Sequence, residues 1–213
     1  PSLIEREPPM TTRSNRLLAI GGLATLMAFL VGVLAYTAIA RPSGRPDAPF
    51  QLMSTRGESV DQTIFKGRPS LVYFGYTHCP EVCPTTLYEM SGWLQQLGAE
   101  GDPLQALFFT IDPERDTLEV LGPYVGAFSD RITGITGDKA ETRKVLDAWL
   151  VTANENRAGD DFSMSHSMSV FLVGADGRLK GMLSYQVTMD DAVARIRDLL
   201  LKDGASGRVA ASG

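Results

Sequence analysis

Cys79 and Cys83 are the only cysteines of the chain and lie close together in the stretch FGYTHCPEVCPTTL, residues 74–87. Three residues separate them, where a common redox motif has two, and a proline follows each. Pro80 and Pro84 disfavour helical backbone at the cysteines before them, and Pro84 also suits the first turn of a helix. We therefore expect Cys83 near the N-cap of a helix, where the helix dipole lowers the pKa of a thiol.

Four interpretations of this cysteine pair compete. A structural disulfide would close a very short loop and stabilise the fold little, and inert buried thiols would not need two prolines at a helix start. Thiolates act both as nucleophiles in disulfide exchange and as ligands of soft metals, so a redox centre and a metal site both fit. Structural zinc needs four ligands, so it would take both cysteines and both histidines of the chain. Cu(I) is soft and accepts fewer ligands, so two thiolates and one imidazole would suffice.

Two histidines could supply the imidazole. His78 precedes Cys79, but neighbours in an extended segment point in opposite directions, which favours an exposed loop residue. His166 lies just before a predicted hairpin, in a segment that we expect to return to the cysteine end of the sheet, although such a residue is more often structural. Met164 and Met168 flank His166 and share its face in an extended run. Thioethers are soft ligands, but methionine near a strand usually fills the core.

Alternating strand and helix signals surround these residues. We predict strands at 50–54, 59–63, 70–76, 104–111 and 132–135, and a hairpin at 169–183 around an Asp-Gly turn. We predict helices at 84–97, 117–128, 139–150 and 189–201, the second with Asp116 as its N-cap. This order predicts an α/β fold with a mixed sheet flanked by helices, as in thioredoxin-like folds. The cysteines occupy the active-site position of such a fold, between the first core strand and the following helix.

Composition narrows the classes of function. Hydrophobic residues make up 44% and charged residues 21%, as in globular proteins. The net charge of −5 and the pI near 5.1 argue against nucleic-acid binding, which needs a basic face. We divide the chain into an N-terminal tail at 1–16, a transmembrane anchor at 17–40, a Pro-rich linker at 41–49, a thioredoxin-like domain at 50–202 and a flexible tail at 203–213.

The anchor prediction rests on residues 17–40, which carry no charge. A helix of this length covers about 36 Å, enough to cross a hydrocarbon core of about 30 Å. A buried soluble helix rarely stays apolar on all faces, and the segment is too long for a cleaved signal peptide despite Ala38-Ile39-Ala40. Basic residues before the span, with Met10 as an alternative start, predict a cytoplasmic N-terminus and an external domain.

Three blocks of sequence resemble the Sco/SenC family, the membrane-anchored copper chaperones of cytochrome c oxidase assembly. They are YTHCPEVCP at 76–84, TIDPERDT at 110–117, and the Ser-His-Ser that precedes VFLVGADG at 165–177. The resemblance covers residues 47–200 and the anchor. It implies that Cys79, Cys83 and His166 bind copper.

The second block supplies further candidates. The resemblance makes Asp112 a second-shell group or a weak fourth ligand, although an aspartate before Pro113 is more often a turn former. We interpret Arg115 as a surface residue. At Ser165 the chain departs from the family pattern, in which an aspartate is expected before the histidine. We therefore expect the loop to position His166 differently than in the family.

The resemblance implies a metallochaperone rather than an enzyme. Its cargo is copper, as Cu(I) or also as Cu(II). Its partner is the copper-bearing subunit of cytochrome c oxidase. Other copper chaperones, thioredoxin-like reductants and membrane lipid are further partners. We expect a single-pass protein of the inner (cytoplasmic) membrane with a periplasmic domain, in preference to the mitochondrial inner membrane.

A different class of function stays open on the same fold. Because an external compartment is oxidising, the pair must be kept reduced, and it could then reduce cysteines of a partner, including those of the oxidase copper site. This alternative is a thiol–disulfide oxidoreductase that uses Cys79 and Cys83. A thioredoxin-like peroxidase has only the low-pKa thiol in its favour.

Overall fold

The structure is a computed structural model that describes residues 27–31, 47–158, 161–165 and 168–210. The chain divides into two units, Pro1–Ser43 and Gly44–Gly213, and the fold below is that of the second unit. Among the described residues, no helix is long and apolar enough to cross a membrane. The anchor predicted at 17–40 lies outside these residues except for a helical segment at 27–31, so it stays a prediction.

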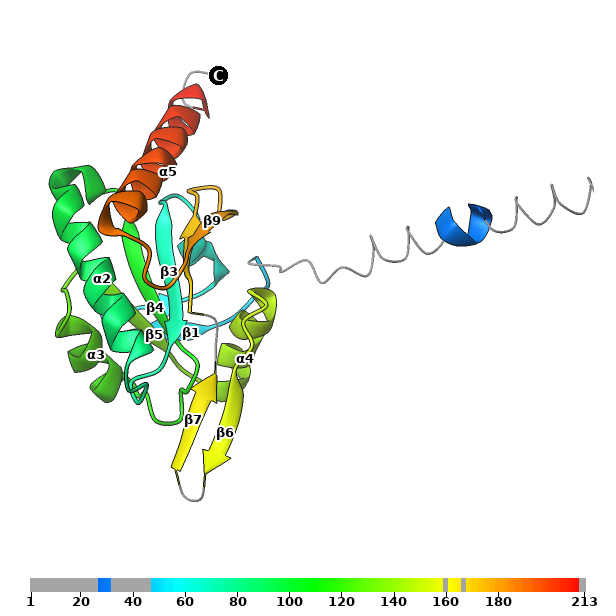
Figure 1. Cartoon of the computed structure of the whole chain (residues 1–213), viewed down its shortest axis with the longest axis vertical. Coiled ribbons are helices and arrows are strands. Elements are labelled where there is room, and N and C mark those ends of the chain that lie inside the picture. Colours follow the sequence, from blue (N-terminus) through cyan, green and yellow to red (C-terminus); the bar gives the residue numbers. More distant parts are fainter. Residues whose placement is uncertain (1–26, 32–46, 159–160, 166–167, 211–213) are drawn as a thin grey trace, which may run out of the picture. The chain divides into compact units, whose positions relative to one another are not determined.

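A mixed seven-stranded sheet forms the centre of the second unit (Figure 1). Its order is β2-β1-β5-β4-β3-β8-β9, and its strands are β1 (Leu52–Ser54), β2 (Ser59–Val60), β3 (Ser70–Gly75), β4 (Gln105–Thr110), β5 (Ile132–Thr136), β8 (Val170–Val173) and β9 (Leu179–Leu183). The central strands β3, β4 and β5 are parallel, whereas β1 and β8 run antiparallel to their neighbours. The predicted α/β class with a mixed sheet is confirmed.

Aromatic residues of β3 and β4 divide between the two faces of the sheet. Tyr73 pairs with Phe108, and Phe74 pairs with Phe109, in parallel register. Successive strand residues point to opposite faces, so each pair contributes to a different core. The ring centroids are 5.8 Å apart in the first pair and 5.5 Å apart in the second. The runs SLVYFG and QALFFT therefore form strands that are buried on both sides.

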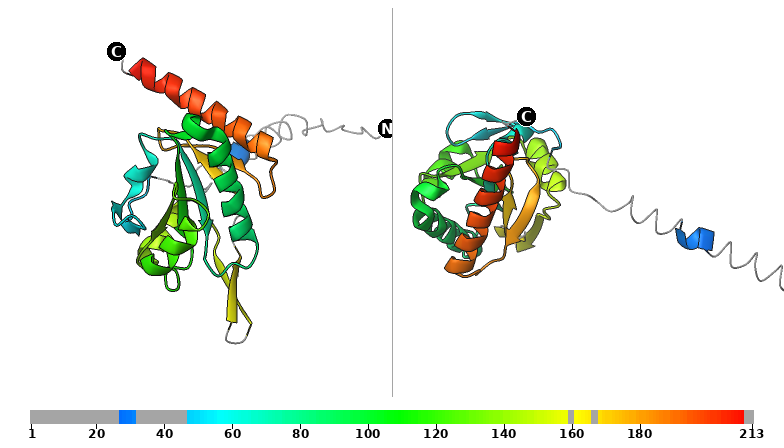
Figure 2. Two further views of the ribbon diagram at one scale, coloured as in Figure 1. Left: turned by 90° about the vertical axis from the view of Figure 1, so that its left-hand side faces the viewer. Right: turned by 90° about the horizontal axis from the view of Figure 1, so that it is seen from above.

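Helices cover both faces (Figures 1 and 2). They are α2 (Val82–Leu97), α3 (Leu118–Gly126), α4 (Lys139–Ala148) and α5 (Met189–Ala210), with short 3-10 helices η1 (Gln62–Phe65) and η2 (Gly98–Gly101). On the face of α2 and α3, Tyr124 packs against Phe108 at 6.1 Å. On the face of α4, Trp149 packs against Phe74 at 5.8 Å.

The closing helix α5 packs along α2 and is longer than predicted. The small, polar residues from 203 onward predicted a tail, but α5 continues to Ala210. The two alanines of residues 203–210 favour helix but its two glycines oppose it, so helix propensity does not account for the extension. The domain boundary drawn at residue 202 therefore falls inside this helix.

The sequence did not predict a second hairpin, which projects from the sheet (Figure 1, yellow). Strands β6 (Asn154–Ala158) and β7 (Asp161–Ser165) pair antiparallel and form a sheet of their own. At the base of this hairpin, Leu150 closes α4 in a left-handed conformation with φ of 54°. The Val151 N–H donates to the Leu146 carbonyl at 2.8 Å there. A non-glycine residue in this conformation turns the chain abruptly out of the helix, at a cost of about 1 kcal/mol.

Candidate functional site

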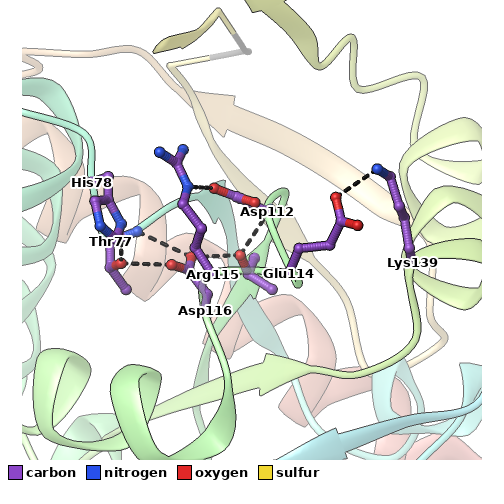
Figure 3. Close-up of polar contacts among 8 residues, drawn as sticks. Thr77, His78, Asp112, Glu114, Arg115, Asp116 and Lys139 are labelled. Atoms are coloured by element: carbon purple, nitrogen blue, oxygen red, sulfur yellow. Dashed lines mark hydrogen bonds and ion pairs between the residues drawn. The ribbon is translucent and has the colours of Figure 1, made fainter. Parts of the chain in front are cut away.

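The cysteine loop, residues 76–81, connects β3 to α2 at the edge of the sheet where the parallel strands end. Residues 111–117 follow β4 and reach the same edge, because neighbouring parallel strands end together. Figure 3 shows side chains of these two segments turned toward one another. Since β8 is antiparallel to β3, the chain enters β8 at this edge too. Three parts of the chain that are distant in sequence thus meet here.

Cys79 lies in the cysteine loop and Cys83 in the first turn of α2, both as thiols with no disulfide between them. The Cys83 N–H donates to Cys79 Sγ at 3.3 Å, and the Cys79 N–H donates to the Tyr76 carbonyl at 3.3 Å. Cys79 is half-buried, whereas Cys83 has no exposed surface. The backbone therefore holds two sulfurs together, one beside solvent and one inside the core.

The environment of Cys83 differs from the one predicted. α2 begins at Val82 with Glu81 as its N-cap, so Cys83 lies within the first turn instead of capping it. The pKa of the Cys83 thiol is raised, because it hydrogen-bonds the Cys79 side chain and because it is buried. The expectation of a lowered pKa for Cys83 is thus wrong. The hydrogen bond with Cys79 and the burial of this sulfur outweigh the helix dipole.

Gly75, the last residue of β3, leaves the room that the Cys83 sulfur occupies. A Cβ at this position would lie 2.9 Å from Cys83 Sγ and 2.9 Å from Cε2 of Phe108. Both contacts are far closer than carbon atoms tolerate in a packed core. A glycine is therefore required wherever the second cysteine packs on the strand in this way.

Unequal exposure of the two thiols predicts an order of modification. During brief treatment of the reduced protein with iodoacetamide at neutral pH, we expect Cys79 to be alkylated first, because it reaches solvent. We expect Cys83 to react at least about tenfold more slowly, because it is buried and because its raised pKa leaves little thiolate. Peptide mass spectrometry measures both rates, and the urea-unfolded chain is the control in which they should converge. Equal rates in the folded protein would contradict this arrangement.

A buried carboxylate, that of Asp116, fastens the cysteine loop to the sheet (Figure 3). Its Oδ1 accepts from the Thr77 hydroxyl at 2.5 Å, and its Oδ2 accepts from the Thr77 N–H at 3.0 Å. Oδ2 also accepts from the Thr110 hydroxyl at 2.6 Å. Asp116 has no exposed surface. Its carbonyl accepts from the Thr136 hydroxyl at 2.7 Å, so one residue joins the loop to β4 and β5.

These contacts correct the role predicted for Asp116. The N-cap of α3 is Thr117, and α3 begins at Leu118. The Asp116 carboxylate already accepts three hydrogen bonds from Thr77 and Thr110, so it is not available to cap the helix. The sequence analysis did not single out either threonine. The signal was their position, because each lies at the end of a predicted parallel strand or just beyond it.

Asp112, the predicted second-shell group, is also nearly buried, at 4% exposed. Its carboxylate accepts a hydrogen bond from the Arg115 guanidinium and pairs with its charge. Arg115 lies over the ring of Tyr76, 5.8 Å from the centroid. Its side chain is 23% exposed, so the prediction of an ordinary surface residue is wrong. This ion pair holds the turn after β4 against the first residue of the cysteine loop, and a metal-binding role of Asp112 stays a prediction.

The remaining candidate ligands are less completely described. His166 lies outside the described residues, and so does the Met164 side chain, whereas Met168 is 48% exposed at the approach to β8. In the described part of the chain, no three His, Cys, Asp or Glu side chains converge on a position for a metal ion. The described residues thus provide two sulfurs, and the third predicted ligand belongs to the segment between β7 and β8.

A family model described as SCO1/SenC matches residues 40–201. The chain belongs to the SCO1/SenC family. The matched range contains the cysteine loop, the segment after β4 and the segment between β7 and β8. The resemblance found in the three sequence blocks is thereby confirmed.

Relatives of this SCO1/SenC chain include mitochondrial and bacterial proteins. The mitochondrial SCO2 homologue of Bos taurus is 36% identical over 132 residues, which are 60% of this chain and 50% of that protein. The chain spans about half the length of the first curated relatives it matches. Copper-bound ScoI of Bradyrhizobium japonicum is 36% identical with a TM-score of 0.67, over 72% of this chain and 98% of that chain. Copper-bound yeast Sco1 is 29% identical with a TM-score of 0.65, over 71% and 86%. These likenesses confirm the thioredoxin-like fold.

Proposed function

We propose that this SCO1/SenC protein binds copper through Cys79, Cys83 and His166 and delivers it to the copper-bearing subunit of cytochrome c oxidase during assembly. The observation that carries the proposal is the cysteine pair itself, in which the Cys83 N–H lies 3.3 Å from Cys79 Sγ. Two adjacent sulfurs are a natural seat for Cu(I), which prefers thiolates and needs few ligands. Relatives at 36% and 29% identity have been solved with copper bound.

The two thiols would have separate roles in holding the ion. Cys83 is fixed inside the core against Gly75 and gives a permanent anchor. Cys79 is half-buried and lies where a partner could reach the ion. Binding replaces the thiol protons, so each ligating sulfur loses its proton as copper enters. His166 supplies the third ligand from the segment before β8, and Asp112 is a candidate outer group at the same edge.

The location of the protein is part of this proposal. An anchor at 17–40 would hold the domain at the inner membrane, with the N-terminus in the cytoplasm and the cysteines in the periplasm. The charge-free run of that segment and the flanking arginines support it.

Titration of the reduced full-length chain in detergent with Cu(I), in competition with a chromophoric chelator, tests the proposal. We expect one Cu(I) per chain, and a loss of affinity of about tenfold or more in each of Cys79→Ser, Cys83→Ser and His166→Ala. Met53→Leu is the control, because Met53 is 36% exposed on β1, three strands away from β3 in the sheet. A wild-type chain that binds no Cu(I), or a Cys83→Ser variant with unchanged affinity, would overturn the proposal.

A thiol–disulfide oxidoreductase is the second candidate, favoured by the contact between the same two sulfurs. Cys79 would attack a partner disulfide and form a mixed disulfide, and Cys83 would then attack the Cys79 sulfur. The partner gains two electrons and leaves with two thiols, and the chain, which has lost those electrons, keeps a Cys79–Cys83 disulfide. The reduction potential of the pair and the rate of reduction of a model disulfide test this role. His166→Ala separates the candidates, since it should abolish copper retention and leave disulfide reduction intact.

A further inference from the structure

His78 is an exposed imidazole in the cysteine loop, between Thr77 and Cys79. Its Nδ1 lies 3.1 Å from the Thr77 hydroxyl oxygen (Figure 3). Which of the two atoms donates this hydrogen bond decides the tautomer of the ring. In a neutral imidazole, the nitrogen without a proton is the one that can bind a metal.

The Thr77 hydroxyl has a single proton, and Asp116 takes it. The Thr77 oxygen donates to Asp116 Oδ1 at 2.5 Å, a short contact typical of a charge-assisted hydrogen bond. Asp116 also accepts from the Thr77 N–H and from Thr110, so its carboxylate acts only as an acceptor. The Thr77 oxygen can therefore only accept from His78. The proton of the neutral ring is on Nδ1, and the lone pair is on Nε2.

The hydrogen bonds on the Thr110 side of Asp116 run in the same direction, toward the carboxylate. The Asp112 N–H donates to the Thr110 hydroxyl at 3.0 Å, and the Thr110 hydroxyl donates to Asp116 at 2.6 Å. Every hydroxyl in this group thus passes its proton toward the Asp116 carboxylate. A rotation of either hydroxyl would leave the buried carboxylate short of a donor, which is costly in a core. The orientation of the Thr77 hydroxyl is accordingly fixed by the fold.

The three side chains differ in how far they are exposed to solvent. His78 is exposed, Cys79 is half-buried and Cys83 is fully buried. An ion at the surface can therefore contact the imidazole directly, whereas Cys83 is covered. His78, Cys79 and Cys83 do not converge on one position in the structure, so the imidazole is not a third ligand alongside both sulfurs.

We propose that His78 Nε2 is a transfer ligand, which holds copper briefly on its way to and from the cysteine pair. The Asp116–Thr77 pair acts as a positioning group that keeps this nitrogen unprotonated in the neutral ring. The inference rests on the proposed copper function and adds a residue outside the Cys79, Cys83 and His166 set. It concerns the rate at which copper exchanges ligands. Because His78 no longer holds the ion once the ion is on the cysteine pair, it adds little to the affinity at equilibrium.

Two measurements test this role. The first is nitrogen-15 NMR of the ring nitrogens in the copper-free, reduced full-length chain at pH 8, where an ordinary imidazole is neutral. We expect the His78 ring to carry its proton on Nδ1, and Thr77→Val to shift the ring toward the other tautomer. A ring protonated on Nε2 in the wild type would overturn the inference, whatever the chain does with copper.

The second measurement is the rate of Cu(I) transfer from a chelator complex, followed by stopped-flow absorbance. His78→Asn is the key variant, because its side-chain amide can still donate to Thr77 but has no counterpart of Nε2. We expect transfer to slow about tenfold while the affinity at equilibrium stays within about twofold. An unchanged rate in His78→Asn, with normal affinity in the wild type, would overturn the inference alone. A wild-type chain without affinity for Cu(I) would instead remove the proposed function on which it rests.

Discussion

Replacement of Asp116 by alanine is expected to lower the free energy of unfolding by about 3 kcal/mol or more. The change removes the acceptor of three hydrogen bonds, from the Thr77 N–H, the Thr77 hydroxyl and the Thr110 hydroxyl. A buried donor without an acceptor costs about 1–3 kcal/mol, and Asp116 has no exposed surface through which water could substitute. We also expect the cysteine loop to lose its fixed position and copper affinity to fall.

Urea unfolding of the reduced protein measures the first effect, and Cu(I) competition measures the second. Asp198→Ala is the matched control, because the Asp198 side chain is 62% exposed and pairs only on the helix surface with Lys202. It should change the free energy of unfolding by no more than about 0.5 kcal/mol. If Asp116→Ala unfolds at the same urea concentration as the wild type, the carboxylate does not hold the loop.

Replacement of Gly75 by alanine is expected to displace the Cys83 sulfur and to cost about 1–3 kcal/mol of stability. The new methyl group would lie 2.9 Å from Cys83 Sγ and 2.9 Å from the Phe108 ring. Both neighbours have no exposed surface, so neither can move aside into solvent. Since the sulfur is one of the proposed copper ligands, affinity for Cu(I) should fall together with stability.

Gly126→Ala is the control for this substitution. Gly126 ends α3, and a Cβ there would meet nothing within 4 Å. Alanine at that position should leave copper affinity unchanged and should stabilise the protein slightly, by up to about 1 kcal/mol. A Gly75→Ala variant that matches this control in both measurements would show that the sulfur does not need the space above the glycine.

Local patterns predicted most of the fold and the position of the cysteine pair between β3 and α2. The buried runs at β3 and β4 and the helical spacing in α2 were readable because each lies within one short window of sequence. The hairpin β6–β7 was missed because NENRA and DFSMS carry few apolar residues to mark an alternation. A strand without this alternation gives no signal for a strand in its sequence.

The errors at the site have a different physical origin. Asp116 was interpreted as a cap because the residues near it in sequence suit one, whereas its actual partner Thr77 is 39 residues away. The lowered pKa predicted for Cys83 assumed an open helix terminus, and the packing of Gly75 and Phe108 against the sulfur overrides that assumption. Both cases depend on how the ends of two neighbouring strands meet, which the sequence specifies only through the whole fold.

Copper bound as proposed would also link the β6–β7 hairpin to the central sheet. The cysteine loop is tied to the central sheet through Asp116, while β6 and β7 pair with each other in a separate two-stranded sheet before the chain continues to His166. An ion held by both cysteines and by His166 would cross-link the segment after the hairpin to the cysteine loop. The opening free energy of the hairpin would then rise with copper occupancy, and slower amide exchange along β6 and β7 would report it. A partner could distinguish the loaded protein from the empty one by touching the hairpin alone.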